Sequence, residues 1–470
     1  MLSSRLPKDL SPSPFFAELE RAKAEVFAEC AVTDGRVGNA GGLPFIDMTV
    51  SSPVKAGLPI DLDAAVDEGR ESFGCWNPDA AGWKSAREAV VEYYRERGGN
   101  FTAGQILLTA STSEAYSVLF KTFCDPGDVI LTPMPGYPLL DTLAQLEHLE
   151  CAPYFLKLQR EKKKKIPALV RLRSPQVAGM TSGADFRFIL DTDSLLAAPE
   201  KAKILLLVSP HNPTGHCVSR EEWNAAVLFC EENDMILVVD EVFGDYGFSP
   251  EVRRSWEYVF GGKRDSRLGS ATLTTGRGDD CGRESLWDAG GGDFVNLPED
   301  GPKCPIFWLN GLSKAVGSPQ LKLGWMAFYA PRERFEEFRA ALEFVEDAYL
   351  SVSAPAQALG TALLPAAAAY ESRVKERLLQ NWQTLREAFP SKYCPEVLGG
   401  WYAVVRLGED DEELTLRLLR EKHVLVQPGF FFDFDEDGWV VISLLQEPVQ
   451  FKEAIGRIRE EDPHLGGHAH

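Results

Sequence analysis

The sequence lacks an apolar run long enough to cross a membrane, since no uninterrupted stretch reaches the roughly 20 residues that a membrane helix needs. The N-terminal segment MLSSRLPKDLSPSPFF also lacks the apolar core of a secretory signal peptide. We therefore expect a cytoplasmic protein that has no membrane partner.

Positive charge is scarce as well. Lysine and arginine total 49 against 70 aspartate and glutamate residues, which gives a formal net charge of -21. Because binding to a phosphate backbone needs clustered cations, this balance argues against a nucleic-acid partner and favours small-molecule ligands.

Patterns that bind metals or form disulfide frameworks are also missing. The nine cysteines include no C-x-x-C pair, and His211 and His216 flank a turn rather than lying four apart on a helix. We expect no metal site, and we expect reduced thiols in place of a disulfide framework.

What the sequence does contain is an alternation of strand and helix patterns from about residue 105. QILLTA, DVILTP, KILLLVSP and MILVVDEV have the pattern of strands, and SEAYSVLFKTF and REEWNAAVLFCEEN have the pattern of helices between them. Continuous apolar strands between helices indicate a parallel sheet that is covered on both faces. The sequence therefore predicts an α/β domain.

The pattern changes after residue 330. PRERFEEFRAALEFVEDAYL predicts a long amphipathic helix that bridges two lobes. WYAVVRL, VLVQP and WVVISLL then have the pattern of strands in a smaller α+β domain. Since single cores stop growing at roughly 250 to 300 residues, we expect a large domain over residues 50–330 and a small domain formed by residues 1–49 and 331–470.

Two segments interrupt the alternation, at about residues 159–186 and 249–303. The first contains the basic run REKKKK, and the second is rich in glycine and aspartate. Both are expected to be surface insertions, and a solvated loop is favoured over an acidic partner for the lysine run.

Ligands of open α/β sheets bind at the carboxyl ends of the strands, so polar residues at these ends are candidates for a site. ILLTASTSEAY ends a strand and begins a helix, so the amides around Thr112 and Ser113 can bind an anion. Asn212 lies in the turn SPHNPTG, Asp240 ends an apolar strand, and Lys314 follows the strand-like PIFWL. Each of the other candidates has an ordinary structural explanation when taken alone: Thr112 and Ser113 as a helix cap, Asn212 as part of a common turn, and Lys314 as a solvated lysine. Asp240 differs, because a buried carboxylate needs a cationic partner.

In chain order, the hydroxyl-rich turn, P-x-Y, N-P-T-G, D-E-x-F and G-L-S-K resemble the motifs of fold type I pyridoxal-phosphate enzymes, specifically the class I/II aminotransferases of the aspartate aminotransferase superfamily. The likeness spans about residues 45–460, apart from the two insertions. It implies pyridoxal 5'-phosphate as cofactor, a mostly parallel seven-stranded sheet in a large domain, a small α+β domain, and a homodimer with sites at the subunit interface.

The resemblance also implies roles for individual residues. Lys314 would form a Schiff base with the cofactor and then move protons, which requires an amine with a lowered pKa. Asp240 would pair with the pyridinium nitrogen, Asn212 would donate to the ring oxygen O3', and Tyr137 would stack on the ring. The residues expected at the phosphate are Thr112, Ser113, Ser313, Lys322 and, reaching the phosphate of the other subunit, Trp76.

Three positions depart from the family's pattern. Phe243 replaces a tyrosine that would donate to O3', and Tyr246 is a candidate substitute for that donor. Gly311 replaces a serine of the phosphate site. Val441 stands where an arginine would bind the α-carboxylate of the substrate, so either another arginine binds it or the substrate lacks it.

The expected reaction is transfer of an amino group between an amino acid or amine and a 2-oxo acid. Two alternatives stay open. One is a lyase or synthase of the same fold, with an aminocyclopropane-carboxylate-synthase-like or C–S lyase activity. The other is a catalytically degenerate protein that still binds the cofactor.

Overall fold

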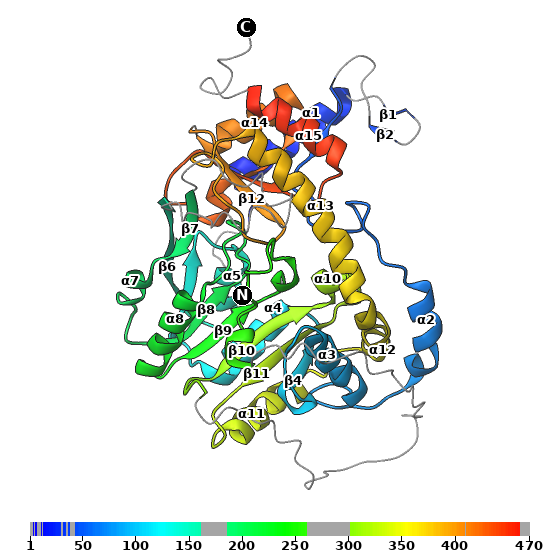
Figure 1. The fold of residues 1–470 in the computed structure, drawn as a ribbon, viewed down its shortest axis with the longest axis vertical. Helices are drawn as coiled ribbons and strands as arrows, with labels where there is room; N and C mark the ends of the chain where they lie inside the picture. The colour runs from blue at the N-terminus through cyan, green and yellow to red at the C-terminus, as the bar shows by residue number, and fades with distance from the viewer. Residues whose placement is uncertain are drawn as a thin grey trace, which may run out of the picture.

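The computed structural model describes residues 3, 5, 6, 11, 13–29, 43–160, 186–260, 301–408 and 410–460, together with the backbone of residues 32–33 and 36–37. Its largest element is an eight-stranded sheet in the order β4-β11-β10-β9-β8-β5-β6-β7 (Figure 1). The strands of this sheet are β4 (Ile106–Thr109), β5 (Val129–Met134), β6 (Glu150–Arg160), β7 (Phe186–Leu190), β8 (Ala202–Val208), β9 (Ile236–Asp240), β10 (Ile306–Gly311) and β11 (Gly324–Tyr329).

Parallel pairing dominates this sheet. β6, β5, β8, β9 and β10 pair in parallel, each with the next. β11 is antiparallel to both of its neighbours, β10 and β4. The predicted α/β class with a mostly parallel sheet is confirmed. The sheet has eight strands rather than seven, because β7 pairs antiparallel with β6 at one edge.

The strand side chains alternate between two apolar layers. In β8, Ile204 and Leu206 pack in one layer with residues of α4, α5 and α11, while Leu205 and Leu207 pack in the other with residues of α3, α8 and α12. Both faces are covered, which is why the strand is apolar at every position except Lys203. The helices of this part are α2 (Asp63–Gly69), α3 (Lys84–Glu96), α4 (Thr112–Phe123), α5 (Leu139–Leu146), α7 (Thr192–Leu195), α8 (Arg220–Glu232), α9 (Glu257–Phe260), α10 (Leu312–Ala315), α11 (Phe335–Asp347) and α12 (Ala354–Leu363).

A second, three-stranded sheet has the order β12-β15-β14. Around it, α1, α14 and α15 lie together at one end of the molecule (Figure 1). β13 pairs in parallel with β3, so the beginning and the end of the chain meet here. The remaining elements are α1 (Pro14–Glu29), β1 (Val32–Thr33), β2 (Arg36–Val37), β3 (Ile46–Asp47), α13 (Ala367–Ala388), β12 (Tyr402–Arg406), α14 (Asp411–Lys422), β13 (Val424–Leu425), β14 (Gln427–Pro428), β15 (Trp439–Ser443) and α15 (Pro448–Glu460).

The helix that bridges the two sheets is not the expected one. The segment that begins at Pro331 forms α11, whose Phe338 and Leu342 pack beneath the large sheet. The helix that runs from the large sheet toward the small one is α13 (Figure 1). Its Val374 and Leu378 are fully buried.

Part of the segment expected to be a surface insertion belongs to the core. Trp256 is 1% exposed, and Arg254 donates a hydrogen bond to the buried carboxylate of Asp245 at 2.9 Å. The high glycine and aspartate content of the segment predicts a surface loop, so the sequence did not indicate that Trp256 is buried in the core. Residues 261–300, and residues 161–185 of the other expected insertion, lie outside the described residues.

The expectation of reduced thiols holds for six described cysteines and is wrong for Cys75. The free thiols are Cys124, Cys151, Cys217, Cys230, Cys304 and Cys394. Cys75 is disulfide-bonded. Among the described helices, none combines the length and apolar character that crossing a membrane requires.

Candidate active site

Polar side chains gather at the carboxyl ends of three neighbouring strands. Asn212 lies in the turn after β8, Asp240 is the last residue of β9, and Lys314 lies in α10, directly after β10. Because β8, β9 and β10 are parallel neighbours, their carboxyl ends share one edge of the sheet. The sheet topology therefore gives these three predicted residues a common location.

Asp240 is held by two hydrogen bonds. Its carboxylate accepts from the Tyr116 hydroxyl at 2.7 Å and from the Val242 backbone N–H at 3.0 Å. Burial raises the pKa of Asp240, while these hydrogen bonds and the charge of Lys314 lower it. The sequence interpretation missed Tyr116. The available signal is its position three residues after Ser113, which places it one turn into the helix that begins at the anion-binding turn.

The Lys314 amine lies over the rings of Trp401 and Phe243, at 4.5 and 5.3 Å from the ring centroids. Burial lowers the pKa of Lys314 to about 8, although the Asp240 charge raises it. The charge of each group thus shifts the pKa of the other, as expected for an amine and a carboxylate that lie near one another. An amine with this pKa is partly unprotonated at neutral pH, the state in which it is a nucleophile.

The lowered pKa predicts how fast the cofactor-free protein captures pyridoxal 5'-phosphate at different pH values. Deprotonation frees the nitrogen lone pair, so the rate should increase as the pH rises through the pKa of Lys314, with a midpoint near pH 8. Stopped-flow absorbance between pH 6 and 11 measures this rate. A midpoint above pH 10, as for a solvated lysine, would contradict the desolvated environment.

Tyr246 does not replace the missing hydroxyl donor. It is fully buried, and its hydroxyl donates to the backbone carbonyl of Lys314 at 2.6 Å. The hydroxyl has only one proton, and because it donates that proton to the main chain, it has none left to donate to the cofactor. Phe243 packs against the rings of Trp401 and Tyr402, with centroids at 5.4 and 6.0 Å. The suggestion that Tyr246 takes over the role lost at Phe243 is wrong.

Restoring the hydroxyl should therefore change the bound cofactor. In Phe243→Tyr, a new donor to the ring oxygen would stabilise its anionic form, so the pKa of the Lys314–cofactor linkage should fall by about one to two. A spectrophotometric pH titration of the holoenzyme measures this pKa. Tyr349→Phe, which removes the hydroxyl of an exposed tyrosine, is the control and should leave the pKa unchanged. An unaltered titration in Phe243→Tyr would show that residue 243 does not reach the ring oxygen.

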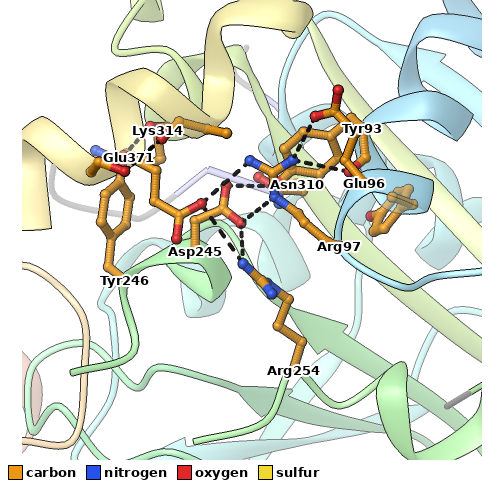
Figure 2. Close-up of polar contacts among 12 residues, drawn as sticks. Tyr93, Glu96, Arg97, Asp245, Tyr246, Arg254, Asn310, Lys314 and Glu371 are labelled. Carbon is orange, nitrogen blue, oxygen red and sulfur yellow. Dashed lines mark hydrogen bonds and ion pairs between the residues drawn. The ribbon is translucent and has the colours of Figure 1, made fainter. Parts of the chain in front are cut away.

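A buried ionic cluster lies beside Lys314, and we call it the Asp245 cluster (Figure 2). The Asp245 carboxylate accepts hydrogen bonds from Arg97 at 3.0 Å, from Arg254 at 2.9 Å and from the Tyr93 hydroxyl at 2.7 Å. Burial alone would raise the pKa of Asp245, but the two guanidinium groups hold it below its usual value. The members of the cluster are Tyr93, Arg97, Asp245, Arg254, Asn310 and Glu371.

The Asp245 cluster fixes the turn after β9 to the strand that precedes Lys314. The Asn310 side chain in β10 donates to the Tyr93 hydroxyl at 3.1 Å, and Tyr93 in turn donates to Asp245. Asp245 is next to Tyr246, whose hydroxyl holds the Lys314 carbonyl. The cluster is therefore a scaffold for Lys314. Sequence reasoning missed it, because it joins distant segments: Arg97 and Asp245 are 148 residues apart, and Arg97 and Glu371 are 274 apart.

The anion-binding turn forms where the sequence places it. Thr112 and Ser113 begin α4, and the Ser111 hydroxyl caps the helix by accepting from the Glu114 N–H at 3.2 Å. Gly324 in β11 comes so close that a Cβ there would lie 3.1 Å from the Thr112 nitrogen. The first backbone N–H groups of this helix have no partner within the helix and are suited to a phosphate.

The start of α10 meets the start of α4 at the same place. Gly311, which ends β10, pairs with Gly324, and the Leu312 N–H donates to the Leu323 carbonyl at 3.0 Å. Ser313 follows in α10. A Cβ on Gly311 would come 3.0 Å from the Gly324 Cα, so a serine there would crowd the strand pairing. This crowding explains why Gly311 replaces the expected serine.

Three further predicted cofactor contacts are more exposed. The Tyr137 ring is 47% exposed, and burial together with the Asp240 charge raises its pKa, which places it near the carboxylate. Lys322 is exposed and ends a short turn with a left-handed backbone, φ 52°. Trp76 is 81% exposed, and no described contact brings it to Lys314 or Asp240. Its predicted contact with another subunit stays a prediction.

The donor set fits pyridoxal 5'-phosphate. The buried Asn212 side-chain oxygen has no partner among the described residues, and leaving such a group unpaired costs about 1 to 3 kcal/mol. A ligand or water that donates a hydrogen bond to this oxygen would satisfy it, and the NH2 group of the same amide is left to donate to a ring oxygen. Asp240 suits a ring nitrogen, the Lys314 amine suits an aldehyde, and the turn at Thr112 suits a phosphate.

Comparison with known proteins agrees with this chemistry. The family model "Aminotransferase class I and II" matches residues 67–458. A glutamate-pyruvate aminotransferase (AlaA) from Haemophilus influenzae is 23% identical over 398 residues, 81% of each chain. A human tyrosine aminotransferase is 24% identical over 434 residues, 88% of this chain and 80% of that protein. An alanine aminotransferase structure from Pyrococcus furiosus superposes with a TM-score of 0.71 at 20% identity, over 98% of this chain and 99% of that one.

Proposed function

Because the chain belongs to the family of class I and II aminotransferases, which use pyridoxal 5'-phosphate, we propose that Lys314 and Asp240 are its catalytic residues. The protein is a pyridoxal-phosphate-dependent aminotransferase, so the prediction from the motifs is confirmed. The single observation that supports this assignment best is geometric: Asp240 ends β9 and Lys314 directly follows β10, the parallel neighbour of β9, so both lie at one edge of the sheet.

When bound, the cofactor supplies an aldehyde that takes up the amino group and a ring that accepts the electron pair of the broken C–H bond. Lys314 attaches the cofactor and then removes a proton from the substrate carbon that carries the nitrogen. The lowered pKa of Lys314 suits both tasks. Asp240 holds a proton on the ring nitrogen, and Tyr116 and Val242 orient its carboxylate for this.

Other residues position the cofactor. Asn212 donates to its ring oxygen, Tyr137 covers the ring, and Phe243 packs beside Lys314. The phosphate is bound at the start of α4 and near α10, by the residues Thr112, Ser113, Ser313 and Lys322. Trp76 contributes from the other subunit of a homodimer, which suits its 81% exposure.

The proposal includes a division into a large domain over residues 50–330 and a small domain formed by residues 1–49 and 331–470, except that α11 and α12 pack with the large sheet. The parallel pairing of β3 with β13 supports it, because this pairing joins residues 46–47 to residues 424–425. A cytoplasmic location is part of the same proposal.

Half-reaction spectroscopy tests the reaction type. Holoenzyme is mixed with amino acids and amines, and cofactor absorbance is followed. Transamination predicts loss of the aldehyde form with release of a carbonyl product. Release of an oxo acid with the aldehyde form regained would indicate a lyase. No spectral change with any donor would indicate a degenerate protein.

A further inference from the structure

The position of Val441 is informative about the substrate. In the register of β12 and β15, Tyr402 pairs with Ser443 and Val404 pairs with Val441. Paired residues of antiparallel strands share a face, so Val441 lies on the same face as Tyr402. The Tyr402 ring contacts Phe243, which lies beside the Lys314 amine. At Tyr402, this face of the small sheet thus reaches the surroundings of Lys314.

Gln427 is the direct neighbour of Val441 on that face. It pairs with Val441 across β14 and β15, and it is half-buried. Within the described residues, no hydrogen bond involves its carboxamide, which keeps two N–H donors and one acceptor available for a ligand. An uncharged amide therefore lies beside the position where the family's pattern calls for a guanidinium.

The described arginines do not compensate for Val441. The charges that shift the pKa values of Asp240, Lys314, Tyr137 and Tyr402 include no arginine. The nearby guanidinium groups already have partners. Arg377 donates to the Ala56 and Leu445 carbonyls at 3.2 and 3.1 Å. Arg97 and Arg254 belong to the Asp245 cluster.

We propose that Gln427 determines specificity, and that the preferred amino donor carries a neutral hydrogen-bonding group, such as a carboxamide, in place of a free α-carboxylate. A carboxamide offers the donor and acceptor that match Gln427 and needs no counter-ion. The exchange balances, because the donor amine becomes a carbonyl compound as the cofactor aldehyde becomes an amine. The aldehyde oxygen leaves as water, and a water molecule supplies the oxygen of the carbonyl product. The inference rests on the proposed function, because it concerns the substrate of that reaction.

Matched donors test this inference on the holoenzyme. Alanine and alaninamide, and phenylalanine and phenylalaninamide, differ only in the group that Gln427 would contact. The second-order rate constant of the half-reaction should be at least about tenfold higher for the amide of each pair. Equal rates, or faster reaction of the free acids, would overturn the inference while leaving the aminotransferase assignment intact. Failure of every donor would overturn both.

Two substitutions separate the contributions. Gln427→Leu should lower the rate constant for the amides about tenfold and leave phenethylamine, which has no such group, unchanged. Val441→Arg should raise the rate constant for the free amino acids at least about tenfold, and Val441→Met, long but uncharged, should not. Since Val441 is fully buried and its arginine variant can fail to fold, Gln427→Leu at its half-buried site gives the independent result. An unchanged amide rate there would overturn the role of Gln427.

Discussion

Lys314→Ala is expected to lower the rate of amino-group transfer by about 10⁴-fold or more, because the variant loses both the covalent attachment of the cofactor and the proton carrier. Cofactor should still bind at the start of α4, but with the absorbance of a free aldehyde. The measurement is a single-turnover half-reaction in the presence of excess pyridoxal 5'-phosphate. Added methylamine should restore part of the rate, since a free amine can carry the proton.

Lys157→Ala is the matched control for this variant. Lys157 is a half-exposed lysine whose amine pairs with Asp191 at the surface, at 2.7 Å. Its removal should leave the half-reaction unchanged. A Lys314→Ala protein that reacts within tenfold of the parent would mean that another amine performs the chemistry.

Asp240→Asn is expected to have the second-largest effect, a loss of roughly 200- to 5,000-fold in the same half-reaction. Breaking a buried charge pair costs about 3 to 5 kcal/mol, and each 1.36 kcal/mol is a tenfold change. The asparagine keeps the size of the side chain but cannot hold the positive charge of a protonated ring nitrogen. The absorbance of the bound cofactor should shift as well, which separates this electronic effect from a loss of folding.

Two further variants help to interpret the Asp240→Asn result, one that weakens the support of Asp240 and one that serves as a control. Tyr116→Phe removes one of the hydrogen bonds to Asp240 and should cost about tenfold, because the carboxylate remains but is held less firmly. Asp191→Asn removes a surface carboxylate and should have no effect. An Asp240→Asn enzyme with the rate of the parent would rule out a pairing with the ring nitrogen.

The parts of the fold that the sequence predicts are those set by local pattern. The stretch ILLLV, residues 204–208, is apolar at every position because both faces of β8 are covered. In the same way, the strand-end positions of Asp240 and Lys314 follow from apolar strands that end in polar residues. The antiparallel strand β7 was missed because its partner β6 lies beyond a long basic segment, so its pairing has no local signature.

The parts of the site that the sequence could not predict depend on contacts between distant segments. The hydrogen bond from Tyr116 to Asp240 joins residues 124 positions apart. Arg254 lies in a segment whose composition suggests a loop, yet it binds Asp245 in the core. The Tyr246 hydroxyl could be assigned to the cofactor or to the main chain from the sequence alone, and only the structure shows that it donates to the Lys314 carbonyl.

The most direct test of this account is to trap the cofactor on the protein. Holoenzyme reduced with borohydride, digested and analysed by mass spectrometry should carry one phosphopyridoxyl group, on Lys314. An adduct on a different lysine, or none at all in a protein saturated with pyridoxal 5'-phosphate, would contradict it.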